Sequence, residues 1–136
     1  MSGPKDENSK TGILLFAHGS RVEEANERVR ALARQVQDSG GFGYVHAVFM
    51  EFGRPDLKAG IAEAVEHGFQ EIIVVPYFLT MGIHLRRDLP ALLENEKALH
   101  PGVKFLISES LEGHPVMPSL LVERICDALS RADFGS

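Results

Sequence analysis

The chain has 136 residues, 44% of them hydrophobic and 24% charged, which suits one folded core and excludes a largely disordered chain. A formal net charge of −5, from 14 basic and 19 acidic residues, lacks the basic surplus of a general nucleic-acid binder. The single cysteine, Cys126, excludes an intrachain disulfide, and no stretch approaches the roughly 20 apolar residues that cross a bilayer.

The N-terminal segment, residues 1–11, is polar and is predicted to be a disordered tail. Its first ten residues lack the apolar stretch of a secretory signal. We therefore expect a soluble, cytoplasmic protein that binds neither nucleic acid nor membrane.

Two strands and a helix are predicted in the first part of the folded region. An apolar run over residues 13–17 predicts a strand that is buried on both faces. Ser20 and the acidic turn after it predict a helix N-cap, and apolar residues at helical spacing continue to Gly40 and Gly41. Residues 44–50, rich in β-branched and aromatic side chains, predict the second strand.

Two more strands and three more helices are predicted in the rest of the chain. They are, in order, a helix after the turn at residues 53–56, a strand at 72–75, a leucine-rich helix after a loop at 76–82, a strand at 103–107 and a helix after Pro115. Pro90 lies inside the leucine-rich helix, which therefore either starts near Asp88 or is broken there. Cys126 falls among apolar residues of the last helix and is interpreted as a packing residue.

The alternation of strands and helices predicts an α/β fold with three αβα layers and a four-stranded parallel sheet. We expect a single domain over residues 12–132, with helices on both faces of the sheet. In such folds, ligands bind beyond the carboxyl ends of the strands. The polar residues at those ends are therefore the first candidates for a functional site.

Histidines and carboxylates gather at the predicted carboxyl ends. His18 follows the first strand, Glu51 the second and His84 the loop after the third, while His114 follows the fourth. Each of them alone could be structural, for example as a loop hydrogen bond or a helix cap. Two imidazoles and a carboxylate together suit iron(II), cobalt(II), nickel(II) or zinc(II) and do not suit magnesium or calcium.

An apolar loop and several arginines surround these candidates. The loop after the third strand could cover a large flat ligand, and guanidinium groups could bind its carboxylates. Core packing and solvated helix charges are the plainer alternatives. No phosphate-binding loop of the Walker or dinucleotide type is present. The candidate ligand-binding residues are Ser20, Arg21, Arg54, Tyr77, Phe78, Leu79, Thr80, Met81, Gly82, Arg86 and Arg87.

Several motifs carry a family resemblance that runs from about residue 12 to 130. They are LFAHGSR at residues 15–21 with AN at 25–26, FMEF at 49–52 with PDL at 55–57, IIVVPYFL at 72–79, GIH at 82–84 and DLP at 88–90. With these motifs the chain resembles the class II tetrapyrrole chelatases, in particular the short sirohydrochlorin chelatases of the CbiX/SirB type. The third-strand segment with Gly-x-His and Asp-x-Pro is the most specific part of the match.

The resemblance implies a chelatase-like half-domain that inserts cobalt(II) or iron(II) into sirohydrochlorin for cobalamin or sirohaem synthesis. It implies that His18 and His84 are the catalytic, metal-binding histidines, with Glu51 as an acidic residue near the metal. The ion is a substrate rather than a permanently bound cofactor, and nickel stays open. Ile83 stands where many relatives have an arginine, which bears on substrate-carboxylate contacts there. Short members resemble half of the two-domain chelatases, so we expect a homodimer.

The mechanism that follows is a hypothesis about proton and metal transfer. His18 and His84 hold the ion, one of them accepts a pyrrole proton, and Glu51 acts as a supporting ligand or base. Two alternatives remain open. A non-catalytic metal carrier would use the same histidines, and a flavodoxin-like module would bind a nucleotide or partner, with Ser20 at a helix N-terminus as its phosphate-binding candidate.

Overall fold

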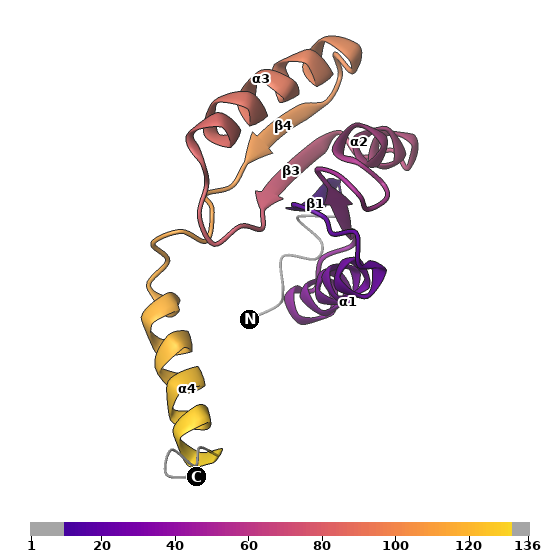
Figure 1. Ribbon diagram of the computed structural model, residues 1–136. Coiled ribbons are helices and arrows are strands. Elements are labelled where there is room, and N and C mark those ends of the chain that lie inside the picture. Colours follow the sequence, from indigo (N-terminus) through magenta and orange to yellow (C-terminus); the bar gives the residue numbers. More distant parts are fainter. Residues whose placement is uncertain (1–9, 132–136) are drawn as a thin grey trace.

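The computed structural model describes residues 10–131 and has an α/β architecture (Figure 1). Its four strands are parallel and lie in the order β2-β1-β3-β4. The elements are β1 (Thr11–Ala17), α1 (Glu23–Gly40), β2 (Val45–Phe49), α2 (Leu57–Glu66), β3 (Glu71–Pro76), α3 (Ile83–Leu99), β4 (Lys104–Ile107) and α4 (Val116–Arg131). The predicted four-stranded parallel sheet is confirmed.

The central strand β1 is buried along its whole length because strands pair with it on both edges and apolar layers cover both faces. It begins at Thr11, whereas the sequence pattern places this residue in the tail. The Thr11 hydroxyl donates a 3.0 Å hydrogen bond to the Glu71 carboxylate of β3. The remaining tail prediction, for residues 1–9, lies outside the described residues.

Two apolar clusters lie on opposite faces of the sheet and define the three layers. Ile13, Leu15 and other odd-numbered β1 residues pack with α1, since successive side chains of a strand point to opposite faces. Leu14 and Phe16 pack on the other face, where α2 and α3 supply the covering residues, among them Ile61 and Leu89. The sheet thus carries α1 on one face and α2 with α3 on the other.

The start of α1 differs from the prediction that Ser20 caps it. The N-cap residue is Val22, and its side chain makes no capping hydrogen bond. The buried Asn26 side chain accepts from the Ser20 amide and donates to the Ser20 carbonyl, both at 2.8 Å. Asn26 thus holds the Ser20 backbone outside the helix, which begins at Glu23. It ends as predicted, with Gly41 in the left-handed region at φ 70°.

Helix α3 is continuous from Ile83 to Leu99, so neither predicted effect of Pro90 occurs. A proline inside a helix removes one backbone donor, and that loss has to be offset by packing. Leu89 and Leu93, on either side of the proline, are 2% and 4% exposed against the sheet. This packing keeps the helix intact, and it places His84 in the first turn of α3.

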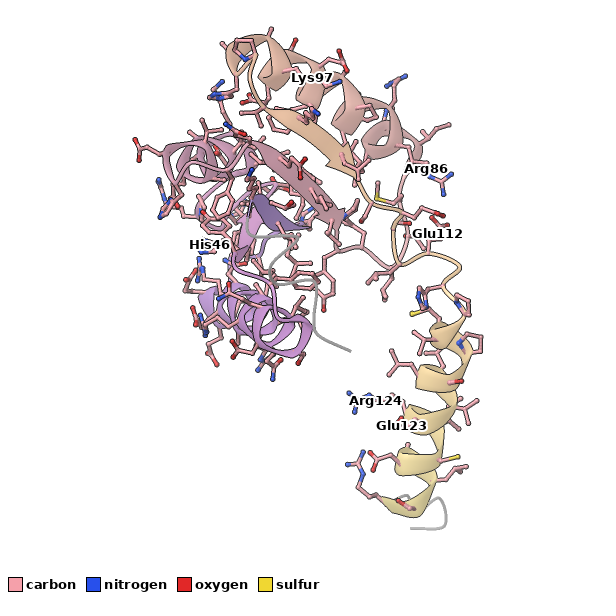
Figure 2. All side chains as sticks on the ribbon, turned by 180° about the vertical axis from the view of Figure 1, so that it is seen from behind. His46, Arg86, Lys97, Glu112, Glu123 and Arg124 are labelled. Atoms are coloured by element: carbon pink, nitrogen blue, oxygen red, sulfur yellow. The ribbon has the colours of Figure 1, made fainter. Side chains whose placement is uncertain are left out.

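The last helix, α4, begins after Pro115 as predicted, but it projects away from the sheet (Figures 1 and 2). No residue of α4 is buried, and Cys126 is exposed. The interpretation of Cys126 as a packing residue is therefore wrong for this chain on its own, because the segment after β4 leads the helix away from the core. Among the described helices, none combines the length and apolar character needed to cross a membrane.

Candidate active site

The carboxyl ends of β1 and β2 are held side by side by hydrogen bonds that continue beyond the strands. The Met50 amide donates to the Ala17 carbonyl at 2.9 Å, and the Glu51 amide donates to the His18 carbonyl at 3.0 Å. Gly19 has a φ of 93°, and a Cβ atom there would lie 1.7 Å from the Glu51 carbonyl oxygen. Only glycine permits this close approach, which brings the residues before and after it next to the β2 loop.

His18 and Glu51 form a pair at this edge. The His18 Nε2 atom lies 3.3 Å from Glu51 Oε2, and the two side chains are 58% and 47% exposed. His18 Nδ1 lies 3.0 Å from the Gly19 carbonyl oxygen, so both ring nitrogens of His18 face groups that can only accept a hydrogen bond. A proton or a metal cation between Nε2 and the Glu51 carboxylate would satisfy both of these atoms.

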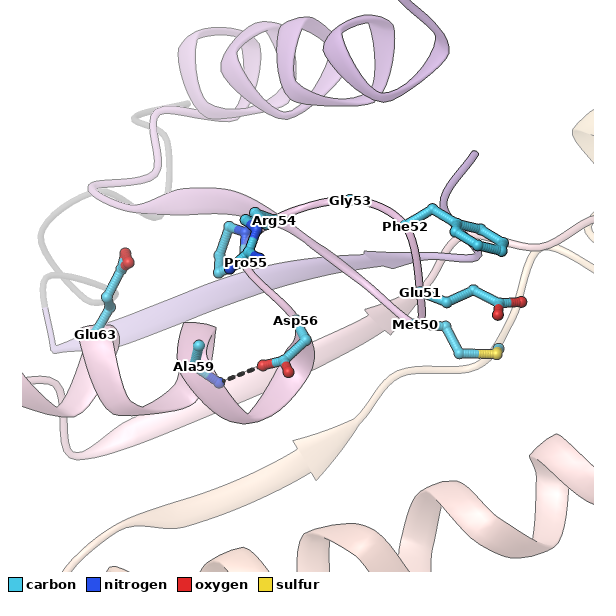
Figure 3. Close-up of a pocket in the computed structure, with 9 residues that line it drawn as sticks. All are labelled: Met50, Glu51, Phe52, Gly53, Arg54, Pro55, Asp56, Ala59 and Glu63. Atoms are coloured by element: carbon cyan, nitrogen blue, oxygen red, sulfur yellow. Dashed lines mark hydrogen bonds between the residues drawn. The ribbon is translucent and has the colours of Figure 1, made fainter. Parts of the chain in front are cut away.

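The loop after β2 divides its side chains between two sides. Figure 3 shows Met50, Glu51 and Phe52 extending to one side, with Arg54 and Glu63 on the other. A pocket of about 630 Å³ follows this loop, and neither His18 nor His84 is among the residues that line it. Arg54 is thus placed away from Glu51. The lining residues are Met50, Glu51, Phe52, Gly53, Arg54, Pro55, Asp56, Ala59 and Glu63.

Arg21 stacks on the β2 loop, with its guanidinium carbon 4.6 Å from the centre of the Phe52 ring. Phe52 has a positive φ of 64° and is 50% exposed. The contact keeps a cation and an aromatic face together beside His18 and Glu51, at the rim formed by the loops that follow the carboxyl ends of the strands. Ser20, also a candidate, hydrogen-bonds the Val22 amide through its hydroxyl at 3.0 Å.

His84 pairs with Arg87 one turn further along α3. The Arg87 guanidinium donates to His84 Nδ1 at 3.0 Å. A guanidinium cannot accept a hydrogen bond, so Nδ1 offers its lone pair and Nε2 carries the ring proton. In this arrangement His84 has no free lone pair for a metal ion, and Arg87 would have to move before Nδ1 could bind one.

Arg86 connects two loops at the rim rather than standing free (Figure 2). It donates to the Glu112 carboxylate at 2.7 Å and to the Met81 carbonyl at 3.1 Å. Glu112 also accepts from the Met81 amide at 3.2 Å. The Met81 amide and then the Arg86 guanidinium hold the pKa of Glu112 below its usual value. The three residues clamp the loop after β3 to the segment after β4.

The loop after β3 has an inner and an outer side. Phe78 packs edge-on against Phe16 of the core at 5.7 Å between ring centres. Tyr77 is 38% exposed, Leu79 67% and Ile83, at the start of α3, 78%. These three side chains with Met50 and Phe52 leave large apolar groups exposed along the same edge as His18 and Glu51. Thr80 and Gly82 are exposed as well.

The candidates therefore form two pairs rather than one closed ligand set. Within residues 10–131, no three His, Cys, Asp or Glu side chains meet as a group that could hold a metal ion. His114 is engaged elsewhere, since its Nδ1 accepts from the Val116 amide at 3.0 Å and so caps α4. The sequence did not predict that Glu112 would join the loop after β3 to the segment after β4. Its only signal in the sequence is its position after the fourth strand.

Comparison with known proteins gives a consistent set of matches. The family model CbiX matches residues 12–128. The chain is 31% identical to sirohydrochlorin cobaltochelatase of Sulfurisphaera tokodaii over 118 residues, which are 87% of this chain and 93% of that protein. It is 28% identical to the chloroplastic sirohydrochlorin ferrochelatase of Arabidopsis thaliana over 122 residues, which are 90% of this chain.

The crystal structure of a CbiX protein from Marinobacter aquaeolei VT8 is also similar, with a TM-score of 0.79 at 30% identity over 90% of this chain and 99% of that chain. Lengths differ among the curated relatives. The chain spans 54% of the Arabidopsis protein with 122 matched residues, and its match to a cobaltochelatase of Methanopyrus kandleri takes in 81 residues, which are 57% of that protein. It therefore covers little more than half the length of several proteins that it matches.

Proposed function

The chain belongs to the CbiX family, and on this basis we propose that it is a chelatase that inserts a divalent metal ion into sirohydrochlorin. Relatives named sirohydrochlorin cobaltochelatase and sirohydrochlorin ferrochelatase support cobalt(II) and iron(II) as the ions. The ion is a substrate in this proposal, and the enzyme needs no permanently bound cofactor. The product would serve cobalamin or sirohaem synthesis.

The observation that carries the proposal is the pair formed by His18 and Glu51. Once Nε2 of His18 is free of a proton, this nitrogen and the Glu51 carboxylate oxygen 3.3 Å away offer mixed nitrogen and oxygen donors to a borderline cation. Both side chains are about half exposed, so an ion can reach them from solvent. Two protein donors leave the remaining coordination positions of the ion for water and then for the pyrrole nitrogens.

We assign the second histidine, His84, to the proton or metal transfer that completes insertion. Its lone pair is occupied by Arg87 in the free protein. A carboxylate at the edge of the tetrapyrrole would bind Arg87 more strongly than a neutral imidazole does, because that hydrogen bond is assisted by charge on both sides. Substrate binding would then release His84 to accept a pyrrole proton or to contact the ion.

The rim suits a flat, acidic ligand. Exposed apolar side chains of the loops after β2 and β3 can cover one face of a macrocycle, and arginines can meet its peripheral carboxylates. Arg21 stacks on Phe52, next to Glu51, and Arg87 contacts His84, so these two arginines lie near the candidate histidines. We also propose a homodimer, because two copies would supply the length of a longer relative such as the Arabidopsis protein, of which one copy spans 54%.

The test is anaerobic spectrophotometry of sirohydrochlorin with cobalt(II), iron(II) or nickel(II). The wild-type protein should accelerate the spectral change of metal insertion over the uncatalysed rate. His18→Ala and His84→Ala should each lower the rate by about 10²–10⁴-fold, the usual range for loss of a proton-transfer group. His67→Ala, an exposed histidine at the end of α2, is the matched control and should leave the rate unchanged.

Two results would contradict the proposal. Full activity in both single variants would remove the two-histidine mechanism. Metal binding without any change in the tetrapyrrole spectrum would indicate a metal carrier instead.

A further inference from the structure

Asn26, in the first turn of α1, is a buried polar residue close in sequence to the candidate active site. It is only 1% exposed. Burying an amide side chain costs free energy unless its polar atoms find partners, and for this reason asparagines mostly lie at the surface. The partners of Asn26 should therefore show what this buried amide does.

Both polar atoms of the Asn26 side chain are bonded, and two of the three bonds go to the backbone of Ser20. Oδ1 accepts from the Ser20 amide at 2.8 Å, and Nδ2 donates to the Ser20 carbonyl at 2.8 Å. Nδ2 also donates to the Glu23 carboxylate at 3.2 Å. One buried side chain thus holds the peptide groups on both sides of Ser20, two residues after His18.

The first of these peptide groups connects Asn26 with the His18 ring. The Ser20 amide and the Gly19 carbonyl belong to the same planar peptide group and point in opposite directions. Asn26 binds the amide side, and the Gly19 carbonyl oxygen lies 3.0 Å from His18 Nδ1. Because the peptide group is rigid, the bond to Asn26 also sets the direction of the Gly19 carbonyl.

The direction of the Gly19 carbonyl matters for metal binding at His18. Nε2, the other ring nitrogen, lies 3.3 Å from Glu51 Oε2. When a cation takes the place of a proton at Nε2, the ring keeps a proton on Nδ1, and the Gly19 carbonyl is the acceptor for it. A bond of this kind orients a metal-binding histidine, and its loss typically weakens metal binding about 10–100-fold.

The third bond of Asn26 leads toward the loop after β2. Glu23, which accepts from Asn26, also accepts from the Arg30 guanidinium at 2.7 Å. Arg30 in turn donates to the Arg54 carbonyl at 3.0 Å. A connected set of hydrogen bonds centred on α1 therefore reaches both loops of the candidate site, the one after β1 and the one after β2.

We propose that Asn26 is a positioning residue for metal binding, which orients the His18 ring through the Gly19–Ser20 peptide group. It acts through His18 and needs no contact with the ion or the tetrapyrrole. The role rests on the part of the proposed function in which His18 and Glu51 bind the ion. A residue that only supported the fold would leave the metal affinity of the folded protein unchanged.

Two variants of α1 separate these roles. Asn26→Leu keeps the approximate size of the side chain and removes its hydrogen bonds. Gln37→Met is the matched control, because the Gln37 side chain also accepts from a backbone amide, that of Val45 at 2.9 Å, but toward the other end of the helix. Both variants lose an amide that binds the backbone and should lower stability, so circular dichroism checks that each is folded.

The first readout is titration of the full chain with cobalt(II) alone, followed by the visible absorption of the bound ion. Asn26→Leu should weaken cobalt(II) binding about 10–100-fold, Gln37→Met should bind like the wild type, and His18→Ala should lose the site. A folded Asn26→Leu protein with wild-type cobalt(II) affinity would overturn the positioning role.

The second readout is the kinetics of metal insertion into sirohydrochlorin. With Asn26→Leu, the KM for cobalt(II) should rise about 10–100-fold while the KM for sirohydrochlorin stays unchanged. A variant that only contained less folded protein would lower kcat and leave both KM values as they are, and this result would contradict the proposal. Weakened cobalt(II) binding by Asn26→Leu, together with a wild-type protein that inserts no metal, would support the positioning role and refute the chelatase assignment.

Hydrogen exchange of the wild-type protein tests the connection without any substitution. After correction for intrinsic rates, the Ser20 amide, bonded to buried Asn26, should exchange at least about tenfold more slowly than the Val22 amide, whose bond to the Ser20 hydroxyl is exposed. Equal rates would contradict the bond on which the proposal depends. If Asn26→Leu does not fold, Asn26→Ala replaces it in both assays, because it leaves room for water to pair with the Ser20 backbone.

Discussion

The close approach of Gly19 to the β2 loop makes a quantitative prediction for Gly19→Ala. A Cβ atom at this position would lie 1.7 Å from the Glu51 carbonyl oxygen, whereas ordinary van der Waals contacts of a Cβ atom begin at 3.4 Å. The carbonyl would therefore have to move by about 1.7 Å, the difference between these two distances. A flexible side chain could absorb such a shift cheaply, but the atom here belongs to the backbone.

The loss of stability can be estimated from the hydrogen bonds that such a movement breaks. The Glu51 amide donates to the His18 carbonyl at 3.0 Å, and the Glu51 carbonyl accepts from the Gly53 amide at 2.7 Å. Two lost hydrogen bonds cost about 1–3 kcal/mol, and a side chain at a positive φ costs about 1–2 kcal/mol more. Gly19→Ala should thus lower the free energy of unfolding by roughly 2–5 kcal/mol.

Urea unfolding with two other glycine variants separates the two contributions. Gly68 has a φ of 94°, and no atom lies within 4 Å of the place where a Cβ would stand, so Gly68→Ala should cost only the conformational part, about 1–2 kcal/mol. Gly102, also in open space and without a positive φ, should tolerate alanine with no loss. If Gly19→Ala were no less stable than Gly68→Ala, the close contact would not exist in solution. Metal insertion should fall with Gly19→Ala, since the shift separates His18 from Glu51.

Two further predictions concern histidine protonation. Arg87→Ala should remove the preference of His84 for a proton on Nε2, which long-range ¹⁵N–¹H spectra report; an unchanged tautomer would contradict the Arg87 contact. Burial lowers the pKa of His46, which stacks on Tyr44 at 3.9 Å. A lowered folded pKa means that stability present above the ordinary value of 6.5 is lost as the pH falls through the folded value. His46→Phe keeps the stacking and should reduce this loss in urea unfolding at pH 7.5 and at lower pH; an equal loss would exclude His46 as its source.

Helices and strands were predicted well where the signal is local. The apolar runs around Leu14 and Val74 predict strands because a strand buried on both faces needs a continuous apolar segment. Gly41 ends α1 as expected, since glycine readily adopts the left-handed conformation of a helix end. The predictions for Ser20 and Pro90 were wrong because distant contacts, the Asn26 side chain and the packing of Leu89, outweigh their local preferences.

The proximity of His18 and Glu51 could also be anticipated, because parallel strands end at one edge and the predicted strands were neighbours. The hydrogen-bond partners of the arginines could not be predicted from the sequence. Arg86 binds Glu112, and Arg87 binds His84. A long flexible side chain can reach many groups, and only the three-dimensional arrangement decides which of them lies within reach.

The amino-acid sequence by itself determined the order of strands and helices, the parallel sheet and the edge where the polar residues gather. These follow from short-range periodicity and from the geometry of strand connections. The tertiary structure decided which donor faces which acceptor at that edge, and it left α4 without a place on its own sheet. The apolar residues of α4 are visible in the sequence, but their exposure follows from the path of the segment between β4 and α4, which contacts far along the chain decide.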